Sequence, residues 1–218
     1  MESLLYSSEG WFSAVYLNLH ALAERGSLLQ PGPDIYAMFT AAMLRPLPPR
    51  RQRFLAVMGQ ADEFTGDMAR YITGQPDTPE ILADLTAKNA FVTRLPGGGY
   101  RFHHMMKACA QRDFDALPPE EQAEYRARYG RWYADRGDYL QALAAFGKCG
   151  RWDAALDVIQ RDAGILLAAL RHQQVLELLD RCGDRVLMEH PTALLVLMRR
   201  MFTWGCLLYT SPSPRDCS

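Results

Sequence analysis

The sequence has few of the features that mark a membrane protein or an exported protein. Its 218 residues contain no apolar run that approaches the roughly 20 residues needed to cross a bilayer. The N-terminus lacks the charged, apolar and small-residue order of a secretion signal. The 24 basic and 25 acidic side chains leave a net charge of −1, so no overall field attracts nucleic acid or an anionic membrane. We therefore expect a cytoplasmic protein with no membrane partner.

Motifs for metal binding, covalent catalysis and phosphate binding are missing as well. The five cysteines form no CxxC pair, so reduced, mostly buried thiols are expected rather than a zinc site or disulfides. Neither G-x-S-x-G nor H-E-x-x-H occurs. The Gly147-Lys148 pair precedes Cys149, where a phosphate loop requires Ser or Thr. The chain is predicted not to be an enzyme, with no catalytic residues, no metal and no cofactor of its own.

An apolar template recurs in the C-terminal half. The spacing i, i+3, i+4, i+7, which marks one face of a helix, is repeated along this region. The repeats are Tyr139, Ala142, Leu143 and Phe146; Trp152, Ala155, Leu156 and Ile159; Val175, Leu178, Leu179 and Cys182; and Leu194, Leu197, Met198 and Met201. We expect TPR-like helical repeats over residues 118–204, with Leu194, Leu197 and Met201 uncovered at the open end of the array.

The middle of the chain predicts a winged-helix domain over residues 34–115. Thr65 and Thr78 are placed to cap short helices. Short β-type runs on either side of Pro96-Gly97-Gly98-Gly99 predict a hairpin, because glycine permits the positive φ angles of a tight turn. A further helix is expected from His103. The predicted fold class is therefore mainly α, a winged-helix domain with one small β-hairpin followed by a helical-repeat array.

The two ends of the chain differ from these regions. Residues 1–26 contain an apolar helical pattern with no preceding strands, so they are expected to be the last helix of a larger module. Residues 206–218 have Ser-Pro repeats and no periodicity, which predicts disorder. This tail is similar to the peptide obtained when a sequencing adapter is translated, in which case it is not native; the alternative is a flexible linker.

Three segments in this order resemble the central part of the MalT-like, LuxR-type, ATP-dependent transcriptional activators. They are SSEGWFSAVYLNLHAL from Ser7, YRFHHMMKAC from Tyr100 and RYGRWYADRGDYLQALAAFGKCGRWDAAL from Arg128. The resemblance implies the end of an NTPase module at residues 1–26, then a winged helix, then a helical-repeat sensor. The family carries a phosphate loop upstream and a helix-turn-helix reader at the far C-terminus, and both are missing here. The implied partners are those missing modules and a small-molecule inducer on the repeats, with ATP and ADP bound by the full-length parent.

The resemblance also assigns a role to a histidine pair. In the wider class of signalling NTPases, a histidine at this winged-helix position reaches the β-phosphate of ADP and holds the resting state closed. His103 matches that position, with His104 beside it. An imidazole suits the task because it donates a hydrogen bond and carries charge when a phosphate is near. The alternative is a packed or capping pair.

An aromatic stripe in the repeat region is the candidate effector or partner face. It consists of Tyr125, Tyr129, Trp132 and Tyr133. Aromatic faces stack well on ring-shaped ligands, but such stripes also form the core between repeat helices. Both interpretations stay open from the sequence.

Direct DNA binding is not expected from this chain. We place the recognition helix near residues 65–73, which contain Asp67 and one cation, Arg70, whereas groove binding depends on several phosphate contacts. A basic cluster precedes it, formed by Arg45, Arg50, Arg51 and Arg53. We interpret that cluster as a solvated face or a domain contact.

The function predicted from the sequence is signal relay. In the full-length regulator, the chain would couple nucleotide state and inducer sensing to a DNA-binding output. The alternative is a free-standing helical-repeat adaptor that binds a protein or peptide in its concave face.

Overall fold

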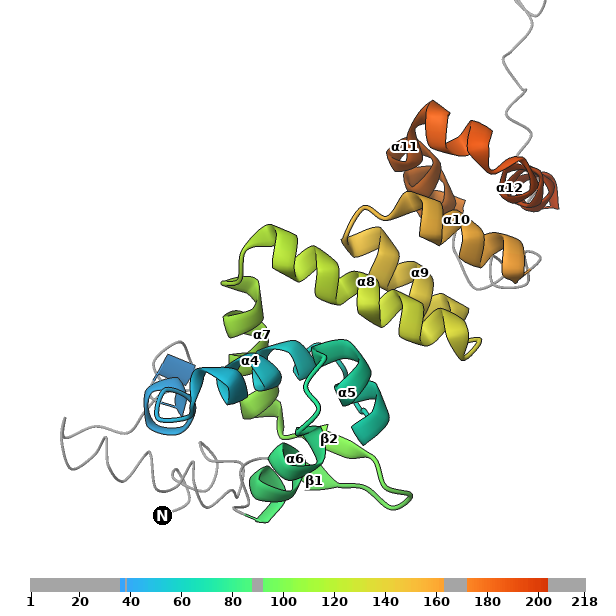
Figure 1. Ribbon diagram of the computed structural model, residues 1–218. Coiled ribbons are helices and arrows are strands. Elements are labelled where there is room, and N and C mark those ends of the chain that lie inside the picture. The colour runs from blue at the N-terminus through green and yellow to red at the C-terminus, as the bar shows by residue number, and fades with distance from the viewer. Residues whose placement is uncertain (1–35, 38, 88–91, 163–171, 204–218) are drawn as a thin grey trace, which may run out of the picture. The chain divides into compact units, whose positions relative to one another are not determined.

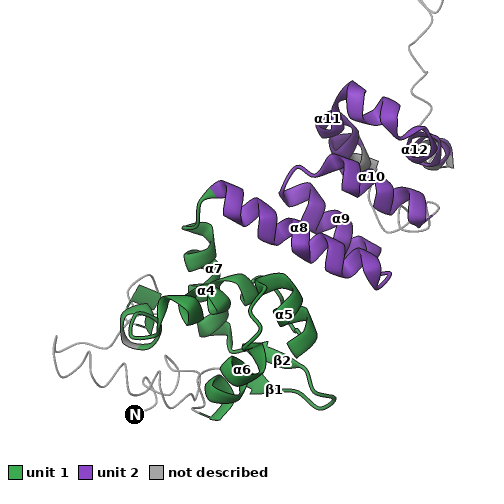
Figure 2. Cartoon of the chain, viewed as in Figure 1, with its two compact units in different colours: residues 1–118 green, residues 119–218 purple. Residues whose placement is uncertain are grey.

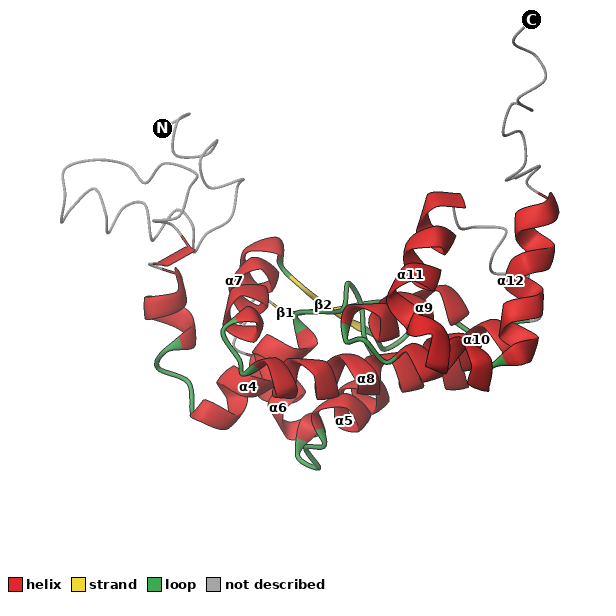
Figure 3. Ribbon diagram, turned by 90° about the horizontal axis from the view of Figure 1, so that it is seen from above, coloured by secondary structure: helices red, strands yellow, loops and turns green. Residues whose placement is uncertain are grey.

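The computed structural model describes residues 36–37, 39–87, 92–162 and 172–203 (Figure 1). The predictions for residues 1–26 and 206–218 fall outside these ranges. The chain divides into two compact units, Met1–Pro118 and Pro119–Ser218 (Figure 2). Figure 3 shows that the described parts are almost entirely helical, with the two short strands drawn in yellow. The prediction of a mainly α chain with one small β-hairpin is confirmed.

Unit 1 has the element order of a winged helix. In chain order it contains the π-helical turn η1 (Thr40–Leu44), the helices α4 (Pro49–Met58), α5 (Gly66–Thr73) and α6 (Thr78–Ala87), the strands β1 (Val92–Arg94) and β2 (Tyr100–Phe102), and the helix α7 (His104–Asp115). Phe64, between α4 and α5, pairs with Tyr100 on β2 through two backbone hydrogen bonds of 3.0 and 2.8 Å. This short stretch adds a third extended segment beside the hairpin.

The helices of unit 1 start and stop at residues suited to those positions. Pro49 occupies the first turn of α4, where no N–H is needed. The Thr65 hydroxyl accepts from the Met68 N–H at 3.2 Å and caps α5, as predicted. Gly74 ends α5 with φ 68°, a left-handed conformation that favours glycine. The four residues from Gly74 to Asp77 then turn the chain into α6, which gives a helix-turn-helix.

The core of unit 1 joins these helices to the hairpin. Its largest fully buried side chains are Phe39, Leu44, Phe54, Leu55, Met58, Ile72, Leu82, Leu85, Met106 and Phe114. α4 packs closely on α7, and Gly59 makes the approach possible, because a Cβ there would lie 2.5 Å from the Ala110 Cβ. Val92 on β1 pairs with Phe102 on β2, and both face the core. The wing is therefore fixed at its base by burial.

Unit 2 is built from consecutive helices that pack on one another. They are α8 (Pro119–Asp135), α9 (Tyr139–Lys148), α10 (Trp152–Arg161), α11 (His172–Glu189) and α12 (Pro191–Thr203). Gly137 turns the chain after α8 with φ 76°, and the Asp138 carboxylate caps α9 by accepting from the Gln141 N–H at 3.5 Å. α8 and α9 lie against each other, and a Cβ at Gly130 would lie 2.5 Å from the Phe146 ring. Glycine is therefore required where these two helices approach.

The apolar template predicts the core of unit 2 well. Ala142, Leu143, Phe146, Ala155, Leu156, Ile159, Leu178, Cys182 and Leu197 all belong to one buried cluster. α11 leaves the helical conformation at Gly183 (φ 69°, ψ 151°), so this element consists of two helical stretches that meet at a kink. His190 connects α11 to α12. Its ring contacts α10, because Gln160 Nε2 lies 3.0 Å from His190 Nδ1.

The prediction that Leu197 is uncovered on the last helix is wrong, and Leu194, also predicted to be uncovered, is half-buried. Leu197 is fully buried, because Ala193 and Leu197 face α10 and α11. The exposed apolar side chains of α12 are instead Leu195 (66%), Met198 (46%) and Phe202 (72%). Each exposed apolar residue lies one position after a residue that was expected to be exposed, so the exposed face of α12 is rotated about the helix axis relative to the prediction. The Met201 side chain lies outside the described residues.

Cys109 and Cys182 are buried, in agreement with the prediction of buried thiols, and Cys149 is half-buried. Burial raises the pKa of the Cys182 thiol to about 11, with the nearby Asp153 charge acting in the same direction. Within the described residues, no helix combines the length and the apolar character required to cross a membrane.

Candidate functional site

The predicted histidine pair lies where the wing meets a helix. β2 ends at Phe102, and His103 is the N-cap residue of α7, with an extended backbone (φ −58°, ψ 146°). Its Nδ1 accepts from the Met105 N–H at 3.4 Å. The His103 and His104 rings lie 4.2 Å apart at their centroids, tilted by 41°. Phe102 and Met105 are buried, so the pair is held at the surface between two core anchors.

The hydrogen bond at Nδ1 fixes the chemistry of the His103 ring. In a neutral imidazole that accepts at Nδ1, the proton resides on Nε2, so Nε2 is the donor. A ring that also takes a proton at Nδ1 can no longer accept from Met105 N. His103 can therefore cap α7 and donate to an anion through Nε2 in the same neutral state. His103 is half-buried, whereas His104 is exposed.

The charged side chains nearest in the sequence to this pair have partners. Lys107 Nζ, one turn along α7, pairs with Asp62, and Arg101 on β2 pairs with Glu63. The Lys107 hydrogen bond lowers the pKa of the Asp62 carboxyl below its usual value of 3.8. Both acidic partners lie in the loop before Phe64. These pairs tie the base of the wing and the start of α7 to the same loop.

The expected position of the recognition helix needs correction. In a helix-turn-helix, the second helix enters the major groove. Because α5 and α6 form this motif, the recognition helix would be α6 and not residues 65–73. α6 carries Glu80 and Asp84 and has no Arg or Lys between Thr78 and Ala87. The correction therefore strengthens the argument against DNA contact by this helix.

Three of the four arginines of the basic cluster pair with carboxylates of unit 1. Arg50 pairs with Asp77 at 2.7 Å, just before α6, and Arg51 pairs with Asp84 on α6 itself. Arg45 lies 3.8 Å from Asp113 on α7. These three arginines therefore contact carboxylates of the same unit. Because their charges are matched by carboxylates, they form no open cationic patch for a phosphate backbone.

The aromatic stripe is partly a structural core. Tyr129 and Trp132 are buried, and burial raises the pKa of the Tyr129 hydroxyl well above 10. The Tyr129 and Tyr133 rings are stacked with centroids 6.2 Å apart, and the Arg136 guanidinium lies 3.1 Å above the Trp132 ring. Tyr125 and Tyr133 are half-buried. For Tyr129 and Trp132 this burial favours the packing interpretation over a ligand floor.

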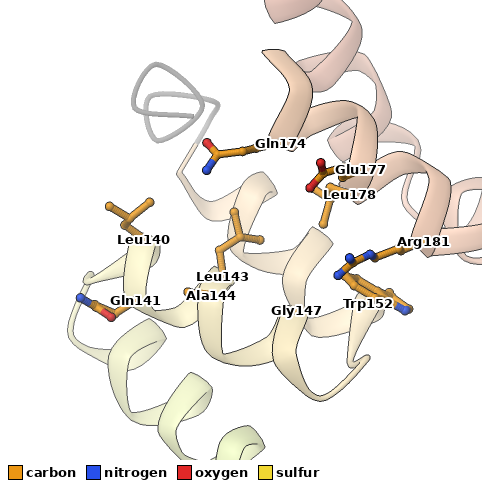
Figure 4. A pocket seen from close by; sticks show the side chains of 10 residues that line it. All are labelled: Leu140, Gln141, Leu143, Ala144, Gly147, Trp152, Gln174, Glu177, Leu178 and Arg181. Carbon is orange, nitrogen blue, oxygen red and sulfur yellow. The ribbon is translucent and has the colours of Figure 1, made fainter. Parts of the chain in front are cut away.

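A groove that the sequence did not reveal lies between α9 and α11 (Figure 4). It has a volume of about 390 Å³. Leu143 from α9, Trp152 at the start of α10 and Leu178 from α11 supply its apolar lining. Glu177 and Arg181 are exposed along one face of α11. A sequence signal did exist: Leu140, Ala144 and Gly147 follow an i, i+4, i+7 spacing that the core of α9 does not use.

Among the residues that the structure describes, no three His, Cys, Asp or Glu side chains come together as ligands for a metal ion.

The comparisons with known proteins bear on unit 1. No curated protein shows significant sequence similarity to the chain. A family match covers residues 40–122, with the description MalT winged helix domain. The match ends four residues into unit 2, so it covers η1, α4–α7, the hairpin and the start of α8. Residues 40–122 are therefore similar to the MalT winged helix domain, as the sequence resemblance indicated for this part of the chain.

Proposed function

We propose that this chain serves as the signal-relay part of a MalT-like transcription regulator, in which the winged helix contacts protein modules instead of DNA. The observation that carries the proposal is the α6 surface of a MalT-type winged helix: it has two carboxylates and no cation. A helix that reads DNA brings positive charge to phosphates, and this one would bring negative charge. A signalling domain in a transcription regulator therefore suits the surface better than a DNA reader.

The histidine pair gives the relay an entry point for nucleotide state. His103 is held at the positive end of α7, where backbone N–H groups and the helix dipole favour an anion. In the proposed mechanism, its Nε2–H donates to the β-phosphate of ADP bound by an NTPase module of the same regulator. That contact would hold unit 1 against the NTPase module. ATP, together with an inducer on unit 2, would favour release, because each ligand shifts the equilibrium by its differential affinity for the two states.

This function implies partners that the chain does not contain. They are the NTPase module, a DNA-binding module and a small-molecule inducer, and the setting would be the cytoplasm. The chain itself would neither hydrolyse ATP nor bind DNA.

The test is a set of three substitutions in the complete regulator, numbered as here. His103→Ala removes both the cap and the imidazole. His103→Asn keeps a good N-cap, because asparagine is among the best capping residues, but removes the imidazole donor. His104→Ala is the neighbouring control. The measurements are the rate of ADP release and the basal transcription of a target promoter.

We expect His103→Ala and His103→Asn to release ADP faster and to raise basal transcription to a similar extent. If His103→Asn behaves like the wild type, the residue is a cap and the nucleotide role is wrong. The reading frame around the gene gives a second test. A phosphate loop upstream and a helix-turn-helix downstream support the relay, whereas native stop codons at both ends support the free-standing adaptor.

A further inference from the structure

We propose that the groove between α9 and α11 binds a small zwitterion with a large apolar body, of the class of free α-amino acids with an apolar side chain. The inference deepens the proposed function, because it assigns the effector site of unit 2, and it rests on that function only for the biological role of the ligand. Binding itself can be measured without nucleotide, promoter or NTPase module.

The groove lies between elements that are fixed by the core. Leu143 on α9 and Leu178 on α11 are each 8% exposed and belong to the buried cluster of unit 2. Trp152 is half-buried and packs against the same cluster, so part of its ring remains accessible. Gly147 has no side chain at this point, and a Cβ there would lie 3.9 Å from the Trp152 ring. The result is an apolar floor open to solvent, bordered by well-placed side chains.

The rim of the groove carries one charge of each sign. Glu177 and Arg181 are separated by one helical turn on α11, so both point to the same side of that helix. In Figure 4 the Arg181 side chain extends from α11 toward Trp152, and Glu177 and Leu178 come from the preceding turn of the same helix. For these two side chains the structure records no hydrogen bond or ion pair with any described residue. Other arginines of unit 2, such as Arg128 and Arg161, do have carboxylate partners.

These charges select the class of ligand. A ligand with only a carboxylate would bind Arg181 but be repelled by Glu177 one turn away, and a simple amine would meet the reverse situation. A zwitterion satisfies both: its carboxylate accepts from the guanidinium fork, and its ammonium donates to Glu177. An apolar body would cover Leu143, Leu178 and the exposed part of Trp152 and gain the hydrophobic contribution. The volume of about 390 Å³ lies at the small end of the range for small-molecule sites.

The experiment uses the chain as it is and measures binding by isothermal titration calorimetry. The probes are L-phenylalanine and L-leucine as test ligands, phenethylamine as the amine without carboxylate, N-acetyl-L-phenylalanine as the acid without ammonium, and glycine as the zwitterion without an apolar body. The variants are Arg181→Gln and Glu177→Gln. Arg185→Gln is the matched control, because it removes the same charge from the same element at an exposed residue outside the groove. Ala144→Phe, at an exposed groove position, is a steric block that changes no charge.

We expect an apolar amino acid to bind more tightly than glycine and than either single-charge analogue. Arg181→Gln and Glu177→Gln should each weaken it about tenfold, which corresponds to the loss of one charge-assisted contact. Ala144→Phe should abolish binding, and Arg185→Gln should leave it unchanged. The proposal is overturned if neither L-phenylalanine nor L-leucine binds at ligand concentrations up to about 5 mM, which are high enough to detect a Kd of about 1 mM. It is equally overturned if both rim substitutions leave the affinity unchanged. Neither result affects the His103 experiment, so the two proposals fail separately.

Discussion

The two units of this chain differ in the contacts that stabilise each of them internally. In unit 1, most of the ion pairs join elements far apart in the sequence: Arg50 and Asp77 are 27 residues apart, and Lys107 and Asp62 are 45 apart, whereas Arg70 and Asp67 lie in one helix. In unit 2, several pairs join residues of one helix, such as Arg128 and Glu124, four residues apart. Unit 1 is closed by long-range contacts, whereas unit 2 adds one helix to the next, as solenoid-like arrays do.

This difference explains where the free surfaces are. The charges of unit 1 are largely used inside the unit, which leaves α6 without a cation and matches Arg45, Arg50 and Arg51 with carboxylates. The stepwise packing of unit 2 leaves a groove beside α9 and an exposed apolar stripe on α12, formed by Leu195, Met198 and Phe202. Under the proposed function, unit 1 would contact other modules through shape and polarity, and unit 2 would supply the binding surfaces.

The largest effect is expected from the core of unit 1. Phe54 is fully buried, so Phe54→Ala should lower the free energy of unfolding of this unit by about 3–5 kcal/mol. Hydrogen exchange followed by mass spectrometry reports on each unit separately. We expect protection to fall in α4–α7 and to stay unchanged in α8–α10. Equal loss of protection in both units would show that the two do not fold independently.

Gly130→Ala tests the tight approach of α8 and α9. The added Cβ meets the Phe146 ring, so we expect a loss of about 1–3 kcal/mol, confined to unit 2. Gly147→Ala is the matched control, because its Cβ meets only an ordinary contact at 3.9 Å and a helical alanine is favoured by about 0.5–1 kcal/mol. Urea unfolding is followed by helical signal, and hydrogen exchange assigns the change to unit 2. The urea midpoint should fall for Gly130→Ala and rise for Gly147→Ala. A stabilising Gly130→Ala would contradict the packing described for this helix pair.

Freeing the basic cluster should make unit 1 more like a DNA-binding domain. Asp84→Asn removes the partner of Arg51, and Asp77→Asn removes that of Arg50. Since these pairs are partly exposed, each substitution should cost at most about 1 kcal/mol of stability. The more informative readout is retention on a heparin column, which we expect to increase for the double variant. Asp67→Asn, whose side chain is 82% exposed and pairs with Arg70 on the same helix at 3.7 Å, is the comparison for the loss of one carboxylate outside the basic cluster.

The smallest effect concerns pH. The pKa of Asp62 is lowered in the folded state, so its pair with Lys107 stabilises unit 1 above the unfolded value of 3.8. That contribution disappears as the pH falls through the lower, folded pKa. The Asp62 side chain is 91% exposed, and screening limits the effect to about 0.5 kcal/mol or less. Asp62→Asn should therefore be slightly less stable than the wild type at pH 7, and the difference should vanish near pH 2. A difference that persists in acid would argue against the pair.

Local features of the fold could be read from the sequence, and long-range ones could not. The Thr65 cap, the wing glycines and the template of α9 and α10 depend on residues close in the chain, and they lie where the patterns predict. The position of the recognition helix was wrong because the spacing did not reveal which of two capped helices is second in the motif. The exposed stripe of α12 depends on which face of this helix packs against α10. Periodicity shows that an apolar face exists, but it does not determine which of two adjacent faces is buried.

The candidate site shows the same limit. His103 could be placed at a strand-to-helix junction because strand and helix signals meet there. Its capping bond to Met105 and the pairing of Arg51 with Asp84, 33 residues away, required coordinates. The groove was missed because it needs α11 beside α9, and no local pattern brings Leu143 and Arg181 together.

The most direct test of the relay account is the affinity of this chain for duplex DNA, measured by fluorescence anisotropy over a range of salt concentrations. We predict no binding at protein concentrations up to about 100 µM even in low salt, because non-specific DNA-binding proteins associate with Kd values of about 1–100 µM already at physiological salt. Micromolar binding that weakens steeply with added salt would contradict the claim that the winged helix relays a signal through protein contacts.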